Sequence, residues 1–352
     1  MHLYEFYHFK HNLIRIVSKS GGYLQYLLNL KLQCGIKIIL QQQTAGKFVC
    51  HIALNIIYFK VQKMYTDIFG NKRYKINLHT HTTVSDGHRT PTEAARLYLA
   101  AGYDAIALTD HWIFGQCTEI EGLEILSGVE YNIPNENTRD GLFHVVAVGM
   151  ERDPGISKSD AITEQDLIDA IHSAGGAAIL AHPAWSLNTP EQILKFHGFD
   201  ATEIYNSVSE AHMSRRPDSS LIVDMLGAQG CLLPLLAVDD THYYDGDECR
   251  GFIMLESDSL EAKDVVNAVR EGRFYASQGP EIHLFRDGDD FIVKCSPANE
   301  IVFLSDGVWS ARVFVGDGIT EARYTPDSLE TFVRAEITDA QGKRAWSNPI
   351  KI

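Results

Sequence analysis

Several features that define other protein classes are absent from this chain of 352 residues. Its six cysteines are scattered and form no CxxC pair, which excludes a disulfide framework and favours reduced thiols in a cytoplasmic protein. No GxSxG motif occurs, so we expect no serine nucleophile of the α/β-hydrolase kind. In the first 63 residues the longest uncharged apolar stretch, residues 48–59, is shorter than the ~20 residues that span a bilayer. We therefore expect no membrane partner.

Basic residues are also few, with 31 Lys and Arg against 46 Asp and Glu and a net charge of −15. Non-specific binding to nucleic acid rests on neutralising phosphates, so this balance argues against an extended nucleic-acid surface. Residues 1–63 are the exception, because they carry eight basic residues and one acid, Glu5, for a net +7. This leader has no lasting helical or strand period, and we predict that the native protein begins at Met64.

Regular patterning begins at residue 74, where short runs rich in Ile, Leu and Val alternate with helical segments. This alternation predicts an α/β region with a parallel sheet or barrel. Capping boxes at 90–93 and 189–192 predict helix starts, and further helices are predicted over 163–175 and 260–270. The predicted strands are Tyr74–His79, Ala105–Thr109, Glu124–Val129, Phe143–Gly149, Ala177–Ala181, Ala201–Tyr205 and Leu233–Val238.

Past about residue 285 the pattern changes to strand-like runs separated by turn pairs such as Asp287-Gly288. The predicted strands here are Phe291–Cys295, Ile301–Leu304, Ala311–Val315 and Phe332–Ile337. The length suits about two domains. We therefore predict an α/β domain over residues 64–285 and a small all-β domain over 286–352, after the leader 1–63.

Polar side chains mark nearly every strand end of the α/β region. The first strand runs into His79-Thr80-His81, and side chains at positions i and i+2 of a strand share a face, so this pair can bind one metal ion. Carboxyl ends of parallel strands meet at one edge, where catalytic residues gather. Imidazole and carboxylate without a thiolate set suit Zn, Mn or Fe. The other strand-end residues are Asp86, Asp110, His111, Glu130, His144, His182, Asp239, Asp240 and His242.

The order His-x-His, Ser-Asp-Gly, Thr-Asp-His, Glu, His, Ala-His-Pro and Asp-x-His, over residues 75 to about 245, resembles the PHP family, named for polymerase and histidinol phosphatase. This resemblance implies a distorted seven-stranded (β/α) barrel of the PHP type and two to three divalent ions of Zn, Mn or Fe. It implies a first metal on His79, His81, Glu130 and Asp240. It implies a second on Glu130, as a bridge, with His144 and His182, and a third on Asp86, His111 and His242.

Two further carboxylates are candidates for catalytic roles beside Glu130. Asp110 adjoins the predicted ligand His111, and we predict that it orients His111 without binding the metal itself. Asp239 is an additional acid where many family members have Ser-Asp-Ala-His, and it either orients a ligand or caps the next turn. Both alternatives are consistent with the sequence.

Four residues are candidates for substrate binding. Arg215 and Arg216 are predicted to clamp the free oxygens of a phosphate, or else to form a solvated basic turn. Asn206 is predicted to reach substrate or to hold a loop. His88 follows the Ser-Asp-Gly motif and is predicted to lie on the substrate side or in solvent, with competition against Asp86 for a metal as the alternative.

Three aromatic residues, Trp112, Phe114 and Trp185, follow ligand-bearing motifs. Each either stacks on a base or ring of the substrate or packs against the protein. The sequence leaves both interpretations open.

These features predict a metal-dependent phosphoesterase (phosphatase, phosphodiesterase or 5'-3' exonuclease-like) that acts on a small phosphorylated molecule, nucleotide or oligonucleotide end through metal-bound hydroxide. The segments 272–277 and 345–349 resemble a two-domain branch of the family with a C-terminal β domain, which includes hydrolases of aryl carbamates. A carbamate or amide hydrolase is therefore the alternative. A non-catalytic metal-binding module is a third hypothesis, which the complete set of ligand positions argues against.

Overall fold

The structure is a computed structural model, and it describes residues 65–133, 142–158, 161–309 and 312–352 with their side chains. In the leader it describes the backbone of three strands alone, β1 (Leu13–Ile16), β2 (Ile39–Gln43) and β3 (Lys47–Ala53), which form an antiparallel sheet in the order β1-β3-β2. The predicted start at Met64 lies outside the described residues. By its internal contacts the chain divides into Met1–Lys63 and Met64–Ile352.

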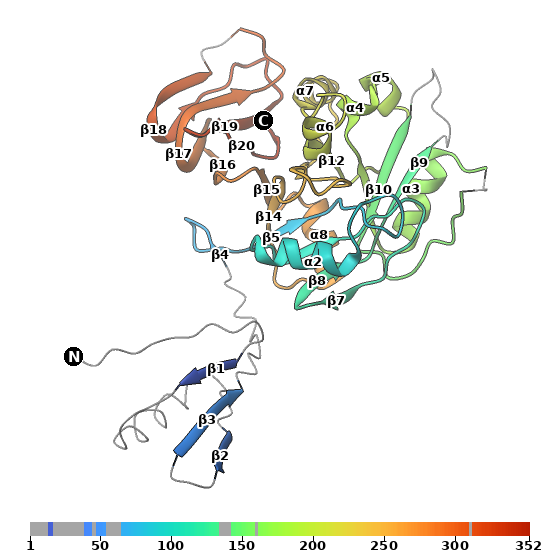
Figure 1. The fold of residues 1–352 in the computed structure, drawn as a ribbon. Helices are drawn as coiled ribbons and strands as arrows, with labels where there is room; N and C mark the ends of the chain where they lie inside the picture. The colour runs from blue at the N-terminus through green and yellow to red at the C-terminus, as the bar shows by residue number, and fades with distance from the viewer. Residues whose placement is uncertain are drawn as a thin grey trace. The chain divides into compact units, whose positions relative to one another are not determined.

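The second unit is a mixed α/β structure in which two sheets carry the buried core (Figure 1). In the first sheet, β5, β6 and β8 run parallel, and β14 lies antiparallel to β5. In the second, β11, β12 and β13 run parallel. The bounds of these strands are β5 Lys72–Asn77, β6 Ala105–Ala107, β8 Leu123–Leu126, β9 Gly128–Ile133, β10 Phe143–Val148, β11 Ala177–Leu180, β12 Ala201–Asn206, β13 Leu235–Val238 and β14 Phe252–Glu256.

Two details differ from the predicted parallel sheet or barrel. Strand β10 lies antiparallel to both of its neighbours, β9 and β11. The strand predicted over Glu124–Val129 is two strands, because the chain passes from β8 in one sheet to β9 in the other at Ser127. A Cβ on Gly128 would lie 2.6 Å from the carbonyl oxygen of Leu108, so this crossing requires glycine.

The two sheets come together at the edge where the predicted ligands lie. Isolated parallel bridges join Thr80 to Thr241 and His111 to Glu130. They link the end of β5 to the end of β13 and the end of β6 to β9. The antiparallel direction of β10 brings its first residues, rather than its last, to this edge. That direction explains why His144 stands at a strand start, whereas Glu130 lies inside β9 and the other candidate ligands follow strand ends.

The predicted helix starts are confirmed by the capping contacts. Thr90 and Glu93 form a capping box with Pro91 at the first helical position, and Thr189 with Gln192 repeats it. Thr163 caps the third helix through Asp166. The helices are α2 Pro91–Ala100, α3 Glu164–Ser173, α4 Pro183–Ser186, α5 Pro190–Ile193, α6 Ser207–Ala211, α7 Ser220–Gly227 and α8 Ala262–Arg270. Among the described residues, no helix has the length and apolar character needed to cross a membrane.

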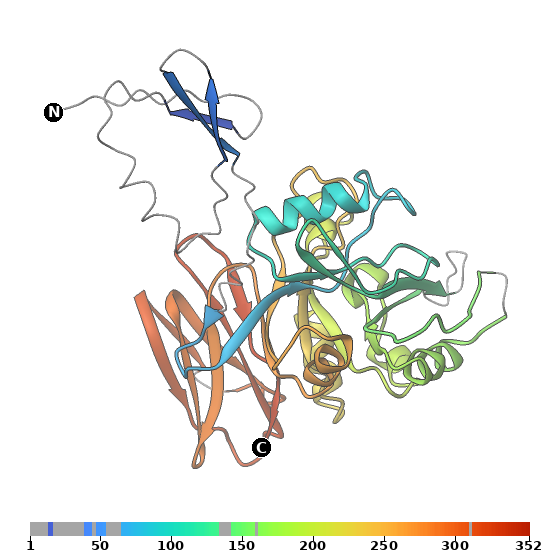
Figure 2. The ribbon, with the colours of Figure 1, turned by 90° about the horizontal axis from the view of Figure 1, so that it is seen from below.

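The C-terminal strands extend the first sheet, which continues in the order β16-β17-β19-β20-β15-β14-β5 with no break near residue 285. Figure 2 shows these orange and red strands gathered on one side of the unit. Two predicted strands, 291–295 and 301–304, are one long strand, because pairing with β18 continues past Pro297 through shifts in register. The remaining bounds are β4 Tyr65–Thr66, β7 Thr118–Ile120, β15 Phe274–Ser277, β16 Ile282–Asp287, β17 Asp290–Leu304, β18 Val313–Tyr324, β19 Phe332–Thr338, β20 Arg344–Trp346 and β21 Ile350–Lys351.

Buried contacts fasten the C-terminal strands to the α/β region. Trp346 is fully buried and stacks on Tyr205 of β12, with ring centroids 5.7 Å apart. The buried guanidinium of Arg334 donates to both oxygens of Asp224 in α7, at 2.6 and 2.8 Å. A bidentate charge pair of this kind fixes geometry as well as adding energy. These strands therefore support the elements that carry the site.

Candidate metal centre

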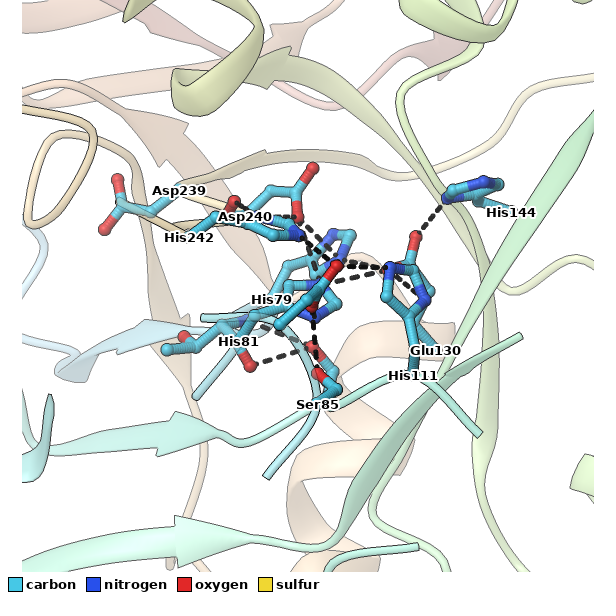
Figure 3. A network of polar contacts seen from close by, with 12 residues as sticks. His79, His81, Ser85, His111, Glu130, His144, Asp239, Asp240 and His242 are labelled. Carbon is cyan, nitrogen blue, oxygen red and sulfur yellow. Dashed lines mark hydrogen bonds and ion pairs between the residues drawn. The ribbon is translucent and has the colours of Figure 1, made fainter. Parts of the chain in front are cut away.

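The nine predicted ligands converge at the edge where the two sheets meet (Figure 3). Their donor atoms form three groups, and within each group these atoms lie within 4.8 Å of one another. All are buried except the half-buried His111 and the more exposed Asp86. The groups are His79, His81, Glu130 and Asp240; Glu130, His144 and His182; and His81, Asp86, His111 and His242.

The first group consists of the His-x-His pair with two carboxylates. The Nε2 atom of His81 lies 2.9 Å from Oε2 of Glu130, and Nε2 of His79 lies 3.1 Å from Oδ1 of Asp240. The two Nε2 atoms are themselves 3.1 Å apart. Because His79 and His81 sit two residues apart in extended chain beyond β5, their rings point the same way. Four donor side chains thus face one small volume.

Glu130 belongs to two groups because its two oxygens face opposite ways. Oε2 faces His79 and His81, at 3.2 and 2.9 Å. Oε1 lies 2.6 Å from Nδ1 of His144 and 3.3 Å from Nε2 of His182. In Figure 3 the carboxylate lies between the His-x-His pair and His144. This placement is what a bridging ligand requires, and the bridging role itself stays a prediction.

The third group forms the more open part of the centre. Oδ2 of Asp86 lies 3.6 Å from Nε2 of His242 and 3.7 Å from Nε2 of His111. His81 joins this group as well, since its Nδ1 lies 3.5 Å from Oδ1 of Asp86. The resemblance implied three ligands here, and the geometry adds the second nitrogen of His81.

The donor set fits divalent cations. Three of its atoms, Nδ1 of His81, Nδ1 of His111 and Oδ1 of Asp240, are buried without a hydrogen-bond partner. Such atoms are costly unless something else satisfies them. Nitrogen and carboxylate oxygen are the donors that Zn, Mn and Fe accept in proteins. We conclude that the residues present suit divalent metal ions.

The local field also favours cations. Burial acts to lower the pKa of His79, but the charges of Asp240 and Glu130 outweigh it and raise that pKa to about 10. A third buried carboxylate, Glu203, adds to the same effect. Burial of Glu130 acts to raise the pKa of its carboxyl, yet the surrounding histidines hold that pKa well below its usual range. Buried negative charge of this density calls for compensating positive charge.

Backbone strain gathers at the same place. His182 has φ 27° and Asp240 has φ 51°, and Trp112, which follows His111, has φ 59°. Residues with side chains adopt this left-handed region at a cost that the surroundings must offset. The strain therefore lies at two ligand positions and beside a third.

Glu203, in the middle of β12, contacts the centre although the sequence analysis does not single it out. Its buried carboxylate lies 2.6 Å from Nδ1 of His79 and accepts from the backbone N–H of His182 at 2.9 Å. Asn206 donates from Nδ2 to the same carboxylate at 2.9 Å. A carboxylate behind a ligating histidine fixes the ring and its tautomer. An acid inside a predicted strand of the α/β region is the one signal that the sequence offers.

Replacing Glu203 by Gln should weaken metal binding by about 10- to 100-fold, the usual cost of losing a partner behind a ligand. The measurement is a metal-binding titration of the purified variant. Glu191→Gln, at an exposed position of α5, is the matched control and should bind metal as the parent does. Equal affinity in Glu203→Gln and the parent would show that His79 needs no such support.

Asp110 holds a loop in place, and among the described residues its carboxylate makes its hydrogen bonds to Thr82 and Ser85. Its Oδ1 accepts from the N–H of Thr82 at 2.8 Å and from the hydroxyl of Ser85 at 2.8 Å. Its Oδ2 accepts from the hydroxyl of Thr82 at 2.8 Å. The hydroxyl of Ser85 also donates to Asp86, at 3.0 Å. Asp110 thus holds the loop that carries Asp86, and its predicted role toward His111 stays a prediction.

Asp239 points away from the cluster, as Figure 3 shows. Its carboxylate accepts four hydrogen bonds, from the hydroxyl of Tyr98 and from the N–H groups of residues 249, 250 and 251, at 2.6 to 2.9 Å. Burial raises the pKa of Asp239 to about 7, while these donors act to lower it. Of the two predicted alternatives, the geometry favours the cap on the following turn.

Asn206 is held inside the protein rather than facing substrate. Its Nδ2 donates to Glu203 and to Oδ2 of Asp240, at 2.9 and 3.0 Å. Its Oδ1 accepts from the N–H and hydroxyl of Ser209, so Asn206 is the N-cap of α6. Of the two predicted alternatives, these contacts favour holding the chain over reaching substrate.

A cavity of about 410 Å³ opens onto the centre. His88 lines it, as the substrate-side prediction requires. Arg215 and Arg216 are exposed and are not among its lining residues, so the predicted phosphate clamp finds no support in the geometry. The complete lining is Asp86, His88, His111, Glu130, His144, His182, Trp185, Met213, Asp240, His242 and Tyr243.

The three candidate aromatic residues separate into two kinds. Trp112 and Phe114 pack against a hydrophobic cluster, and Nε1 of Trp112 donates to Asn132 at 2.5 Å. Trp185 lines the cavity, with its ring 5.0 Å from that of His182 and 5.5 Å from that of His144. Only Trp185, among these three, is placed to meet a ligand.

No family model matches the chain. A curated relative, a probable phosphatase of Thermoanaerobacter sp. strain X514, is 43% identical over 79 residues, which cover 18% of this chain and 32% of that protein. The chain is similar to a phosphatase. A 5'-3' exoribonuclease of Haemophilus influenzae is 32% identical over 84 residues, covering 22% of this chain and 30% of that protein. The chain thus spans about a third of the length of the curated relatives it matches.

Solved structures with a similar arrangement have low sequence identity. One is a two-domain protein from Bacteroides vulgatus that contains a predicted PHP-like metal-dependent phosphoesterase, at 15% identity and a TM-score of 0.47, covering 81% of this chain and 96% of that one. Another is an amidohydrolase from Chromobacterium violaceum, at 19% identity and a TM-score of 0.37, covering 56% of this chain and 96% of that one.

Proposed function

We propose that this protein is a metal-dependent phosphoesterase that hydrolyses a small phosphorylated molecule or the end of a short nucleotide chain. The observation that carries this proposal is the cluster of nine histidine and carboxylate side chains in three adjoining groups, with Glu130 shared by two of them. The curated relatives, named as a phosphatase and an exoribonuclease, support the same bond type.

The residues of the centre would have different roles in hydrolysis. Divalent ions held there would supply Lewis acidity and activate water near neutral pH. Glu130 would hold two of the three groups in register through its opposed oxygens. Glu203 and Asn206 would keep His79 and Asp240 oriented, and Asp110 would hold the loop that carries Asp86.

We also propose a finer description of the fold. The bridges Thr80–Thr241 and His111–Glu130 bring the two sheets toward a ring, which supports a distorted barrel of the PHP type. In this description residues 64–285 carry the chemistry and residues 286–352 support it through Arg334 and Trp346. The leader, residues 1–63, takes no part.

A carbamate or amide hydrolase is the second candidate, and one observation favours it. Among the described residues that line the cavity, none is Lys or Arg, so a phosphate would meet no guanidinium or ammonium group there. A neutral carbamate needs no such partner. The test compares turnover of phenyl phosphate and phenyl carbamate by the metal-loaded protein, with inorganic phosphate as inhibitor. The phosphoesterase proposal expects phosphate release and competitive inhibition; turnover of the carbamate alone would overturn it.

Removing residues 1–63 should leave turnover and metal content unchanged, because every proposed ligand lies at or after residue 79. The measurement is kcat/KM of the full chain and of residues 64–352 under identical metal loading. A fall of orders of magnitude in the shortened chain, with its fold intact by circular dichroism, would contradict this prediction.

A further inference from the structure

One wall of the cavity is formed by residues that belong to none of the three donor groups. Three of its lining residues, Trp185, Met213 and Tyr243, have large apolar or aromatic side chains and donate nothing to the three groups. They come from separate places: α4, the chain after α6, and the chain after β13. Together with the donors they enclose the same space.

This wall extends over two different groups of donors. The ring of Trp185 lies 5.0 Å from that of His182, in the group that contains Glu130 and His144. Tyr243 is the residue after His242, and the centroids of the two rings lie 6.4 Å apart. His242 belongs to the group that contains Asp86. An ester bound at the centre would therefore project its remaining part between these side chains.

The Tyr243 part of this wall is held by contacts within the protein. The ring of Tyr243 packs against those of His212 and His88, at 4.5 and 5.3 Å. The carboxylate of Asp247 accepts from the N–H groups of His242 and Tyr243, at 2.8 and 2.9 Å. Side chains that are already ordered bind a ligand at a lower entropic cost.

We infer that Trp185, Met213 and Tyr243 determine specificity by binding a flat, uncharged ring attached to the phosphate ester. Aromatic side chains stack on rings, and Met makes favourable contacts with them. No Lys or Arg lies among the described lining residues, so no guanidinium or ammonium group is there to bind a second phosphate. This inference rests on the proposed phosphoesterase function and names its substrate class, a ring-bearing phosphomonoester.

The test uses two pairs of phosphomonoesters that differ by the ring. Benzyl phosphate is compared with ethyl phosphate, and adenosine 5'-monophosphate with ribose 5-phosphate. The full-length, metal-loaded protein should prefer the ring-bearing member of at least one pair by about tenfold or more in kcat/KM, the scale of one stacked ring. A preference in the first pair alone indicates a benzyl-type ester, and one in the second alone indicates a nucleotide.

Variants of the wall should remove this preference while the esters without a flat ring are still hydrolysed. Trp185→Ala and Tyr243→Ala should each lower kcat/KM for the preferred ester with a flat ring about tenfold and change kcat/KM for its partner without one little. Trp309→Ala is the matched control, because Trp309 is 92% exposed and does not line the cavity. Calorimetric binding of benzylphosphonate and adenosine 5'-phosphonate analogues against methylphosphonate should follow the same order without turnover.

The failures of the two proposals are distinguishable. If the metal-loaded protein hydrolyses none of the four esters, the phosphoesterase function itself fails. If it hydrolyses them with no preference for a ring, or if the wall variants leave the preference unchanged, the specificity inference is overturned and the phosphoesterase function stands.

Discussion

Glu130→Gln should lower turnover by at least about 10³-fold, the upper end of what removing one electrostatic group costs. The substitution keeps the shape of the side chain but removes its charge. One of the two opposed oxygens also becomes an NH₂ group that faces histidine nitrogens, at positions now 2.6 to 3.3 Å from them. Two of the three groups would lose a ligand at once, so metal content should fall together with turnover.

The experiment measures both quantities on the same preparation. Glu119→Gln is the control, because Glu119 lies exposed in β7 of the neighbouring sheet and joins no group of donors. It should keep parental turnover and metal content. Near-normal turnover and metal content in Glu130→Gln would refute the shared-ligand role of this residue.

Changing Asp239 to Asn should affect mainly the stability of the protein, and changing Asp240 to Asn should affect mainly its turnover. Asp239→Asn should lower the free energy of unfolding by about 2–4 kcal/mol. In the parent the carboxylate accepts hydrogen bonds from the N–H groups of residues 249–251, and in the variant an NH₂ group would face some of these donors and could not accept from them. Its metal affinity should change little, since the carboxylate contacts the turn at residues 249–251. Asp240→Asn should instead abolish turnover by removing a ligand of the first group.

Urea unfolding in the presence of a chelator separates these effects, because bound metal stabilises whichever variant retains it. Under those conditions Asp239→Asn should unfold at a lower urea concentration than the parent, because its loss of stability does not depend on bound metal. If Asp239→Asn lost metal while keeping its stability, the capping role would be refuted and the alternative, a ligand-orienting role, would be correct.

Local signals in the sequence predicted much of the fold and the assembly of the donors. The capping boxes at Thr90 and Thr189 fix helix starts through contacts three residues apart, so they can be recognised without the fold. The His-x-His pair depends only on the alternation of an extended chain. Because strand ends meet at one edge, donors far apart in sequence could be assigned to one centre.

Other features depend on long-range contacts that no local pattern encodes. The crossing at Ser127 and the antiparallel direction of β10 follow from which strands pair, and short apolar runs carry no direction. Glu203 reaches His79 across 124 positions of the chain. Arg215 is basic and close in sequence to the site, yet it is exposed and lies outside the cavity lining. In each case the tertiary structure decides which residues meet.

The most direct test of this account is elemental analysis of the purified protein, made together with an assay of phosphate release from an aryl phosphate. The account predicts two to three bound ions of Zn, Mn or Fe per chain, held by the three adjoining groups, and release of phosphate. A protein that contains no metal, and takes up none on reconstitution, would contradict the account at its base.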